Sequence, residues 1–271
     1  MIEIVWRHDP AAGVQERPPG TAAEARARLE AGSAAFASLV NEGGRRVFTL
    51  PAQAFGLPTG PDGEIAQEPF AAVLGCSDAR APVELILGQA VNDLFIVRVA
   101  GNVPGTECLG SLDYAVSNLA SLRLIVVLGH TGCGAVTAAV DAFLAPETYF
   151  EIADDPELRA VVDAIMAAVT TAADALADVH GPRASERPDH RAALVETAVV
   201  GHAAFTASHI LARSRSGRSG RLGVAFGVYD LARRSVGLPR ADGWTAGLFD
   251  PPHDAAALRE LVLEVAAART G

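Results

Sequence analysis

The sequence predicts an α/β protein with a mostly parallel central β-sheet flanked by helices. Half of its 271 residues are hydrophobic, which is ample for a sizeable core. Short apolar runs, typical of buried parallel strands, alternate with helical stretches long enough for crossover connections. We expect strands near residues 71–75, 93–98, 123–129 and 221–228. These features fit a single domain that comprises residues 1–271.

The first part of the chain is expected to be an N-terminal helical arm over residues 1–50. Within it, residues 21–43 read as an amphipathic helix. Thr21 with Glu24 three residues later is the pattern of a capping box, which marks the start of such a helix. Residues 144–192 are expected to form a helical insertion.

Charge and cysteine content disfavour several classes of protein. The chain has 32 acidic and 22 basic residues, and its net charge of −10 argues against nucleic acids and anionic membranes as partners. Two of the three cysteines lie in the motifs described next, which leaves no pair for a structural disulfide and suits a reducing cytoplasm. The first ten residues do not resemble a signal peptide, and we see no apolar run of the roughly 18 residues that a membrane span needs. We expect a cytoplasmic protein.

Two short segments carry the candidate chemistry. GCSDAR at residues 75–80 follows one apolar run, and GHTGC at residues 129–133 follows another. The carboxyl ends of parallel strands meet at one edge of a sheet, where open α/β sheets hold their ligands. The side chains expected to meet there are Cys76, Asp78, Arg80, His130 and Cys133.

The spacing within the two segments suits a metal ion. Cys76 and Asp78 are two residues apart, so they project to the same side of an extended chain. His130 and Cys133 can share the first turn of the following helix, whose positive end favours a thiolate. Two sulfurs and an imidazole are ligands that zinc prefers, and three protein ligands leave a fourth position for water or for Asp78.

Each of these residues also has a purely structural interpretation. Cys76 alone would be read as a small core residue, and His130 as a histidine satisfied within a turn. Asp78 and Arg80 could form a simple ion pair. Their joint placement after two strand-like runs makes the structural account the weaker one.

The two motifs resemble those of the β-class carbonic anhydrases, in which a CxDxR segment is followed further along the chain by HxxC. The likeness is strong over residues 67–137, the expected metal-site core, and weaker over residues 191–213 and 221–231. It implies the fold of that family, zinc as cofactor, and CO2 and bicarbonate as substrate and product. It also implies an arm that packs on a partner subunit, and so a homodimer or a higher homo-oligomer.

The resemblance assigns roles to the motif residues. Cys76, His130 and Cys133 would be the zinc ligands. Asp78 and Arg80 would form a catalytic dyad in which Asp78 orients zinc-bound hydroxide for attack on CO2, and Asp78 would be a possible fourth ligand in a closed state. The substrate pocket would be lined by Gln67, Phe95, Ala100 and Gly101.

Other features bear on this expectation. Val73 stands where the bicarbonate-regulated branch of the family has a tryptophan, which favours an open site. Hydrolysis of CS2 or COS on the same scaffold is an alternative activity, and a non-catalytic, zinc-stabilised interaction module is an alternative function. His202 and His209 lie on one face of a predicted helix, and we interpret them as packing residues.

Overall fold

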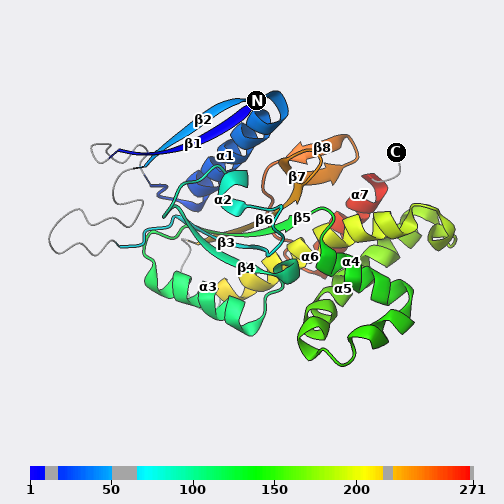
Figure 1. Ribbon diagram of the computed structural model, residues 1–271. Helices are drawn as coiled ribbons and strands as arrows, with labels where there is room; N and C mark the ends of the chain where they lie inside the picture. Colours follow the sequence, from blue (N-terminus) through cyan, green and yellow to red (C-terminus); the bar gives the residue numbers. More distant parts are fainter. Residues whose placement is uncertain (10–17, 51–65, 216–221, 269–271) are drawn as a thin grey trace.

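The computed structural model describes residues 1–9, 18–50, 66–215 and 222–268. Among these residues, a six-stranded sheet has the strand order β4-β3-β5-β6-β7-β8 and carries helices on both faces (Figure 1). This architecture confirms the predicted fold class.

The four parallel strands are those that the apolar runs predict. They are β3 (Ala71–Cys76), β4 (Leu94–Val99), β5 (Leu124–His130) and β6 (Gly223–Asp230). All residues of β3 and β5 are buried, because these two strands are neighbours inside the sheet and helices cover both faces. The two motif segments therefore leave the sheet side by side, at the carboxyl ends of β3 and β5.

An antiparallel extension of the sheet was not expected from the sequence. β7 (Ser235–Arg240) pairs with β6, and β8 (Gly243–Ala246) pairs with β7, both antiparallel. Proline lacks the amide hydrogen that a ladder needs, so Pro239 is not typical of a strand paired on both sides. The pairing of β7 with β6 covers only residues 235–237, and Pro239 pairs with Trp244 of β8 alone.

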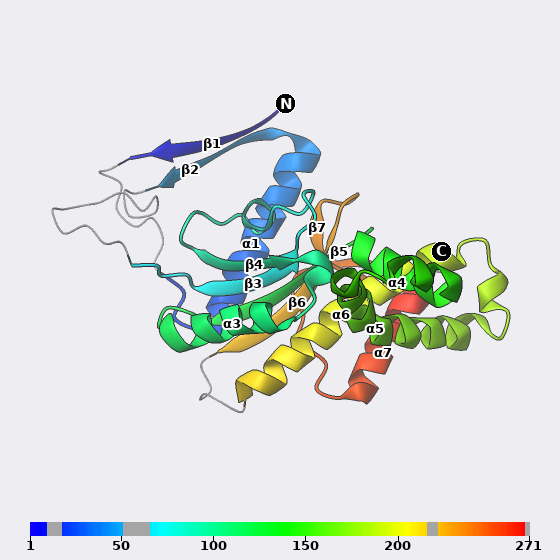
Figure 2. The same cartoon turned by 60° about the horizontal axis from the view of Figure 1, so that its bottom comes forward.

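The larger hydrophobic core lies on one face of the sheet (Figure 2). The helices that contribute to it are α3 (Thr106–Asn118), α4 (Gly134–Leu144), α5 (Pro156–His180), α6 (His190–Arg215) and α7 (Ala255–Ala268). Helix α6 packs directly on β5 and β6, whereas α5 packs on α4, α6 and α7. The face of α6 that meets the carboxyl half of β5 can therefore reach the motif segments.

The opposite face of the sheet is covered by α1 (Ala22–Glu42) and the short helix α2 (Val83–Ile86). The predicted cap is present, because the Thr21 hydroxyl accepts a hydrogen bond from the Glu24 amide at 3.2 Å. The Glu24 carboxylate turns back to accept from the amide of Gly20 at 2.7 Å.

The arm also contains strands that the sequence does not signal. β1 (Ile2–His8) and β2 (Gly44–Leu50) pair in parallel on either side of α1 in the chain, and they form a separate two-stranded sheet. Figure 1 shows this pair beside α1, above the main sheet. The pairing is between distant parts of the chain, so no local pattern announces it.

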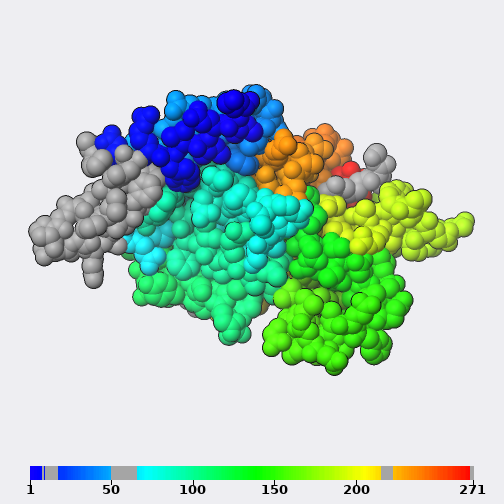
Figure 3. Space-filling model, in the orientation of Figure 1, coloured from blue at the N-terminus to red at the C-terminus, as the bar shows by residue number. Residues whose placement is uncertain are grey.

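The segment between α4 and α6 comprises the 3-10 helices η3 (Pro146–Ile152) and η4 (Ala184–Glu186) with α5 between them. Figure 3 shows it, coloured green to yellow-green, as a lobe at the side of the molecule. By length and composition alone, α5 and α6 could each cross a membrane, but α6 is mostly buried within the protein, as core helices are. The expectations of no membrane partner and of a cytoplasmic location stay predictions.

Candidate metal centre

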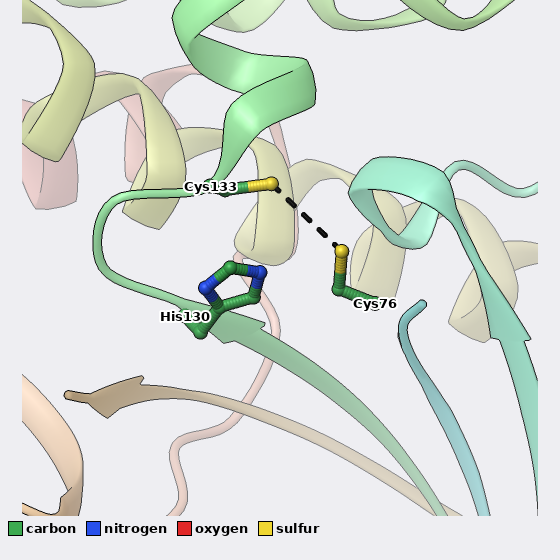
Figure 4. Close-up of side chains that lie close together, drawn as sticks. All are labelled: Cys76, His130 and Cys133. Atoms are coloured by element: carbon green, nitrogen blue, oxygen red, sulfur yellow. Dashed lines mark hydrogen bonds between the residues drawn. The ribbon is translucent and has the colours of Figure 1, made fainter. Parts of the chain in front are cut away.

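Three potential metal ligands converge at the carboxyl edge of the sheet (Figure 4). Cys76 is the last residue of β3, His130 is the last residue of β5, and Cys133 is the N-cap of α4. Gly132 adopts a positive φ of 63° in the turn between His130 and Cys133, a conformation that glycine adopts without strain. The two sulfurs and the imidazole nitrogen all lie within 4.8 Å of one another, and all three residues are buried.

The donor set fits a zinc ion. The sulfurs of Cys76 and Cys133 are 4.0 Å apart, far beyond a disulfide bond. Tetrahedral zinc with sulfur at about 2.3 Å would place two sulfurs about 3.8 Å apart. His130 Nδ1 lies 3.0 Å from the Thr131 carbonyl, to which it can donate, and this tautomer leaves Nε2 as a bare acceptor. That buried Nε2 has no hydrogen-bond partner among the described residues, and a metal ligand needs such a free lone pair.

The sulfurs of Cys76 and Cys133 are close enough for a hydrogen bond between them. Donation from Cys133, helped by His130 and by the amide of Gly101, lowers the pKa of Cys76 to about 3 against the opposing effect of burial. The same hydrogen bond, together with burial, raises the pKa of Cys133 although amides in the first turn of α4 oppose this. Burial disfavours charge on His130, but the Cys76 thiolate outweighs it and raises the pKa of the imidazole. A divalent cation at this position would stabilise both sulfurs as thiolates.

Asp78 and Arg80 form a two-pronged ion pair beside the ligands. Arg80 Nε donates to Asp78 Oδ1 at 3.0 Å, and Nη2 donates to Oδ2 at 2.6 Å. The backbone amide of Arg80 adds a third bond to Oδ1 at 2.8 Å. These bonds from Arg80 hold the pKa of Asp78 well below its usual range. Asp78 Oδ2 lies 3.8 Å from His130 Nε2, so an ionised carboxylate lies next to the ligand group.

Two supporting residues were not found from the sequence. Arg98 of β4 donates to the carbonyl of Cys76 at 2.9 Å and to that of Asp78 at 2.6 Å. Glu196 of α6 accepts from the Gly132 amide at 3.1 Å. Neither residue belongs to a motif, and only the register of β4 and the packing of α6 bring them here.

Gly101 and Ala100 lie in the 3-10 turn η2 (Ala100–Asn102) that follows β4. The amide of Gly101 donates to the Cys76 sulfur at 3.3 Å, while Ala100 is exposed. His202 is buried and its Nε2 donates to the Gly101 carbonyl at 2.9 Å, whereas His209 on the same helix is exposed. The packing interpretation of His202 thus misses a specific hydrogen bond.

Two of the expected pocket residues, Gln67 and Phe95, lie at the other end of the sheet within the same chain. Exposed Gln67 precedes β3, whose five residue steps at about 3.3 Å each span about 17 Å before Cys76. Phe95 pairs with Ala72 in the first half of β3, and its ring lies 6.4 Å from that of Tyr114. A single chain therefore does not bring Gln67 or Phe95 to the ligands.

The fold and this group of residues define an α/β protein with a Cys2His set of candidate metal ligands at the carboxyl edge of its sheet. The sequence model of the carbonic anhydrase family matches residues 71–236, which is more than half of the chain. The chain therefore belongs to the carbonic anhydrase family.

Individual relatives match a shorter segment. Carbonic anhydrase 2 of Mycobacterium tuberculosis (strain CDC 1551 / Oshkosh) is 50% identical over 76 residues, which are 28% of this chain and 36% of that protein. The carbonic anhydrase of Mycolicibacterium smegmatis is 49% identical over 77 residues, 28% of this chain and 37% of its own. The aligned segment thus spans just over a third of each relative. A solved structure, the β-carbonic anhydrase CafA of Aspergillus fumigatus, aligns with a TM-score of 0.44 at 24% identity, over 74% of this chain and 85% of that one.

Proposed function

We propose that this protein binds zinc through Cys76, His130 and Cys133 and catalyses the reversible hydration of CO2 to bicarbonate and a proton. Membership of the carbonic anhydrase family supports this activity. The observation that carries the proposal is the buried Nε2 of His130, which has no hydrogen-bond partner in the described part of the chain and lies beside two sulfurs 4.0 Å apart. A bound zinc ion would supply a Lewis acid that makes water nucleophilic near neutral pH.

The dyad orients the nucleophile in this proposal. Arg80 keeps Asp78 ionised, and Oδ2, which accepts only one bond from Arg80, retains a lone pair that can accept a hydrogen bond from water at the site. Because two bonds from Arg80 hold the carboxylate plane, Asp78 has a fixed direction and is restrained from turning onto the metal. Orientation of this kind lowers the entropic cost of attack on CO2.

We further propose that the protein works as a homo-oligomer, at least a dimer, in which a second copy supplies Gln67 and Phe95. The distance along β3 between Gln67 and Cys76 supports this, since one chain cannot bring the two together. The exposed amide of Gln67 could donate to a substrate oxygen. The apolar ring of Phe95 suits CO2, which carries no net charge.

The test is metal analysis combined with stopped-flow CO2 hydration over about pH 6.5 to 9, the range in which a metal-activated water titrates. We expect about one zinc per chain and turnover that rises with pH. Cys76→Ser and Cys133→Ser should lose both. Cys108→Ser, which changes the partly buried cysteine outside the site, is the matched control and should keep both.

Parallel assays with CS2 and COS separate the alternatives. Zinc with hydrolysis of CS2 or COS, but no hydration of CO2, would replace the proposed substrate by a related linear one. Zinc without turnover of any of the three would favour a zinc-stabilised interaction module. Wild-type protein without zinc would contradict the proposed site.

A further inference from the structure

His202 is a buried histidine with one well-defined hydrogen bond. Its side chain is 1% exposed, and it comes from α6, far along the chain from both motifs. The partner of Nε2 is the carbonyl of Gly101, an acceptor only, so Nε2 must carry the proton. Burial lowers the pKa of His202 to about 4 although this bond opposes the shift, so the ring is neutral near pH 7 and Nδ1 has no hydrogen. Nδ1 has no hydrogen-bond partner among the described residues, which leaves the bond to Gly101 as the only one found for this imidazole.

The turn that His202 contacts has an unusual backbone. Gly101 has a φ of 62° and Asn102 a φ of 46°, two consecutive residues in the left-handed region. Gly101 is also tightly enclosed, since a Cβ there would come within 2.9 Å of Ala135 Cβ and 3.0 Å of Ile165 Cδ1. A backbone of this kind persists only where its surroundings hold it, and His202 supplies a directed hydrogen bond that does so.

Gly101 also contacts the candidate metal site. The Gly101 amide donates to Cys76 Sγ at 3.3 Å, while its carbonyl accepts from His202. The two bonds thus hold Gly101 from both sides, one toward α6 and one toward the sulfur. An N–H donor on a thiolate fixes the direction of the sulfur lone pairs and withdraws charge from it.

We propose that His202 is a positioning residue of the metal site, which acts through Gly101 to keep a backbone amide on the Cys76 sulfur. This inference rests on the proposed metal site, but not on the identity of the substrate. Two hydrogen bonds connect the groups: one joins the imidazole of His202 to the carbonyl of Gly101, and the other joins the amide of Gly101 to the sulfur of Cys76. Loss of the imidazole donor frees the turn, so the sulfur becomes more electron-rich and less firmly held.

The first experiment detects the amide on the metal-bound sulfur directly. Wild-type protein is labelled with 15N and loaded with 113Cd, a spin-active substitute for zinc. A hydrogen bond from the Gly101 amide to the Cys76 sulfur transmits a scalar coupling between the amide proton and the metal. We expect this coupling in the wild type. Its absence from folded, cadmium-loaded protein would overturn the proposal without any variant.

A pair of variants then separates positioning from packing. His202→Leu fills the space without a donor, whereas His202→Gln places an amide donor near the position of Nε2. We expect His202→Leu to lose the coupling and to bind zinc about 10–100-fold more weakly, the range found when partners of metal ligands are removed, so that a chelator takes the zinc faster. It should also shift the thiolate-to-metal charge-transfer band of the cobalt-loaded protein. His202→Gln should restore most of each property.

Thr206→Val is the matched control, because Thr206 is fully buried one turn along α6 and its hydroxyl has no hydrogen-bond partner in the described structure. It should match the wild type in spectrum and release rate. Wild-type behaviour of His202→Leu would overturn the role of His202. If His202→Leu does not fold, His202→Gln decides alone. Zinc release from His202→Gln that is as fast as from an unfolded control would contradict the role of His202. Wild-type protein that binds none of the three metals would instead refute the proposed site itself.

Discussion

Arg80 donates two parallel hydrogen bonds, of 3.0 Å and 2.6 Å, to the Asp78 carboxylate, and it also donates to the carbonyl of Gly132 at 3.2 Å. Gly132 belongs to the second motif, so the ion pair connects the segment after β3 to the segment after β5. Arg80 is itself 58% exposed, whereas Asp78 is only 16% exposed. The structural value of the pair therefore lies in orientation more than in stability, since exposed partners are screened by solvent.

Arg80→Ala should keep zinc but lower CO2 hydration at neutral pH by about tenfold or more, because Asp78 loses the two bonds that orient it. The released carboxylate can then turn to the metal and block the fourth position. Metal analysis and stopped-flow assays at pH 7 measure the two effects separately. Arg80→Lys keeps the charge but not the fork of donors, so its rate of CO2 hydration should lie between those of the wild type and Arg80→Ala. Full activity of Arg80→Ala at pH 7 would contradict the role of the dyad.

Mixing two inactive variants tests whether Gln67 acts across subunits. Gln67→Ala keeps the ligands, and Cys76→Ser keeps Gln67, so a mixed dimer has one complete site if Gln67 serves the partner. Random mixing makes half of the dimers mixed, so co-expression should recover about a quarter of wild-type activity in a two-fold symmetric dimer. If Gln67 serves its own chain, the mixture should show no more activity than the two separate variants.

Gly101→Ala should destabilise the protein by about 2–5 kcal/mol, the sum of a left-handed alanine and an overpacked Cβ. The new methyl would meet Ala135 and Ile165. Urea denaturation measures the change. Gly110→Ala within α3, where a Cβ meets no described atom within 4 Å, is the opposite control and should stabilise the protein by about 0.5–1 kcal/mol. Equal effects of the two substitutions would mean that the η2 turn is not constrained as described.

Because His202 is buried, the free energy of unfolding should decrease as the pH falls. The folded protein keeps His202 neutral down to a pKa of about 4, while the unfolded chain takes up this proton below about pH 6.5. Between these values the unfolded state binds more protons, so this contribution is complete above pH 6.5 and is lost as the pH falls toward 4.

Urea denaturation of the metal-free protein at pH 7 and pH 5 measures this loss. Between pH 7 and pH 5, the free energy of unfolding of the wild type should fall by about 2 kcal/mol more than that of His202→Gln, because glutamine does not titrate. The difference between the two proteins cancels the other titrating groups. Equal losses would show that His202 is protonated alike in both states.

Much of the fold could be predicted because its signals are local. The runs that became β3 and β5 are continuous and apolar, since a parallel strand covered on both faces has no polar side. The cap at Thr21 is read from two residues three apart. β1 and β2 could not be predicted, because they are stabilised by pairing with each other across α1 and by no pattern of their own.

The candidate site divides in the same way. Cys76, His130 and Cys133 could be named from the sequence as candidate ligands, because ligands of a metal must be particular chemical types at the ends of neighbouring strands. Arg98, Glu196 and His202 could not, because hydrogen bonds to backbone groups have no preferred spacing along the chain.

By itself, the sequence determined the parallel strands, the two motifs and the donor set, since hydrophobic periodicity and ligand chemistry are properties of short segments. Only the tertiary structure decided that the Gly101 amide lies on the Cys76 sulfur, that His202 bonds the carbonyl of the same residue, and that Gln67 lies at the far end of β3. Such relationships arise from the register of strands and the packing of α6, which are set by the whole core. Their physical basis is contact between residues far apart in the chain, which no local pattern encodes.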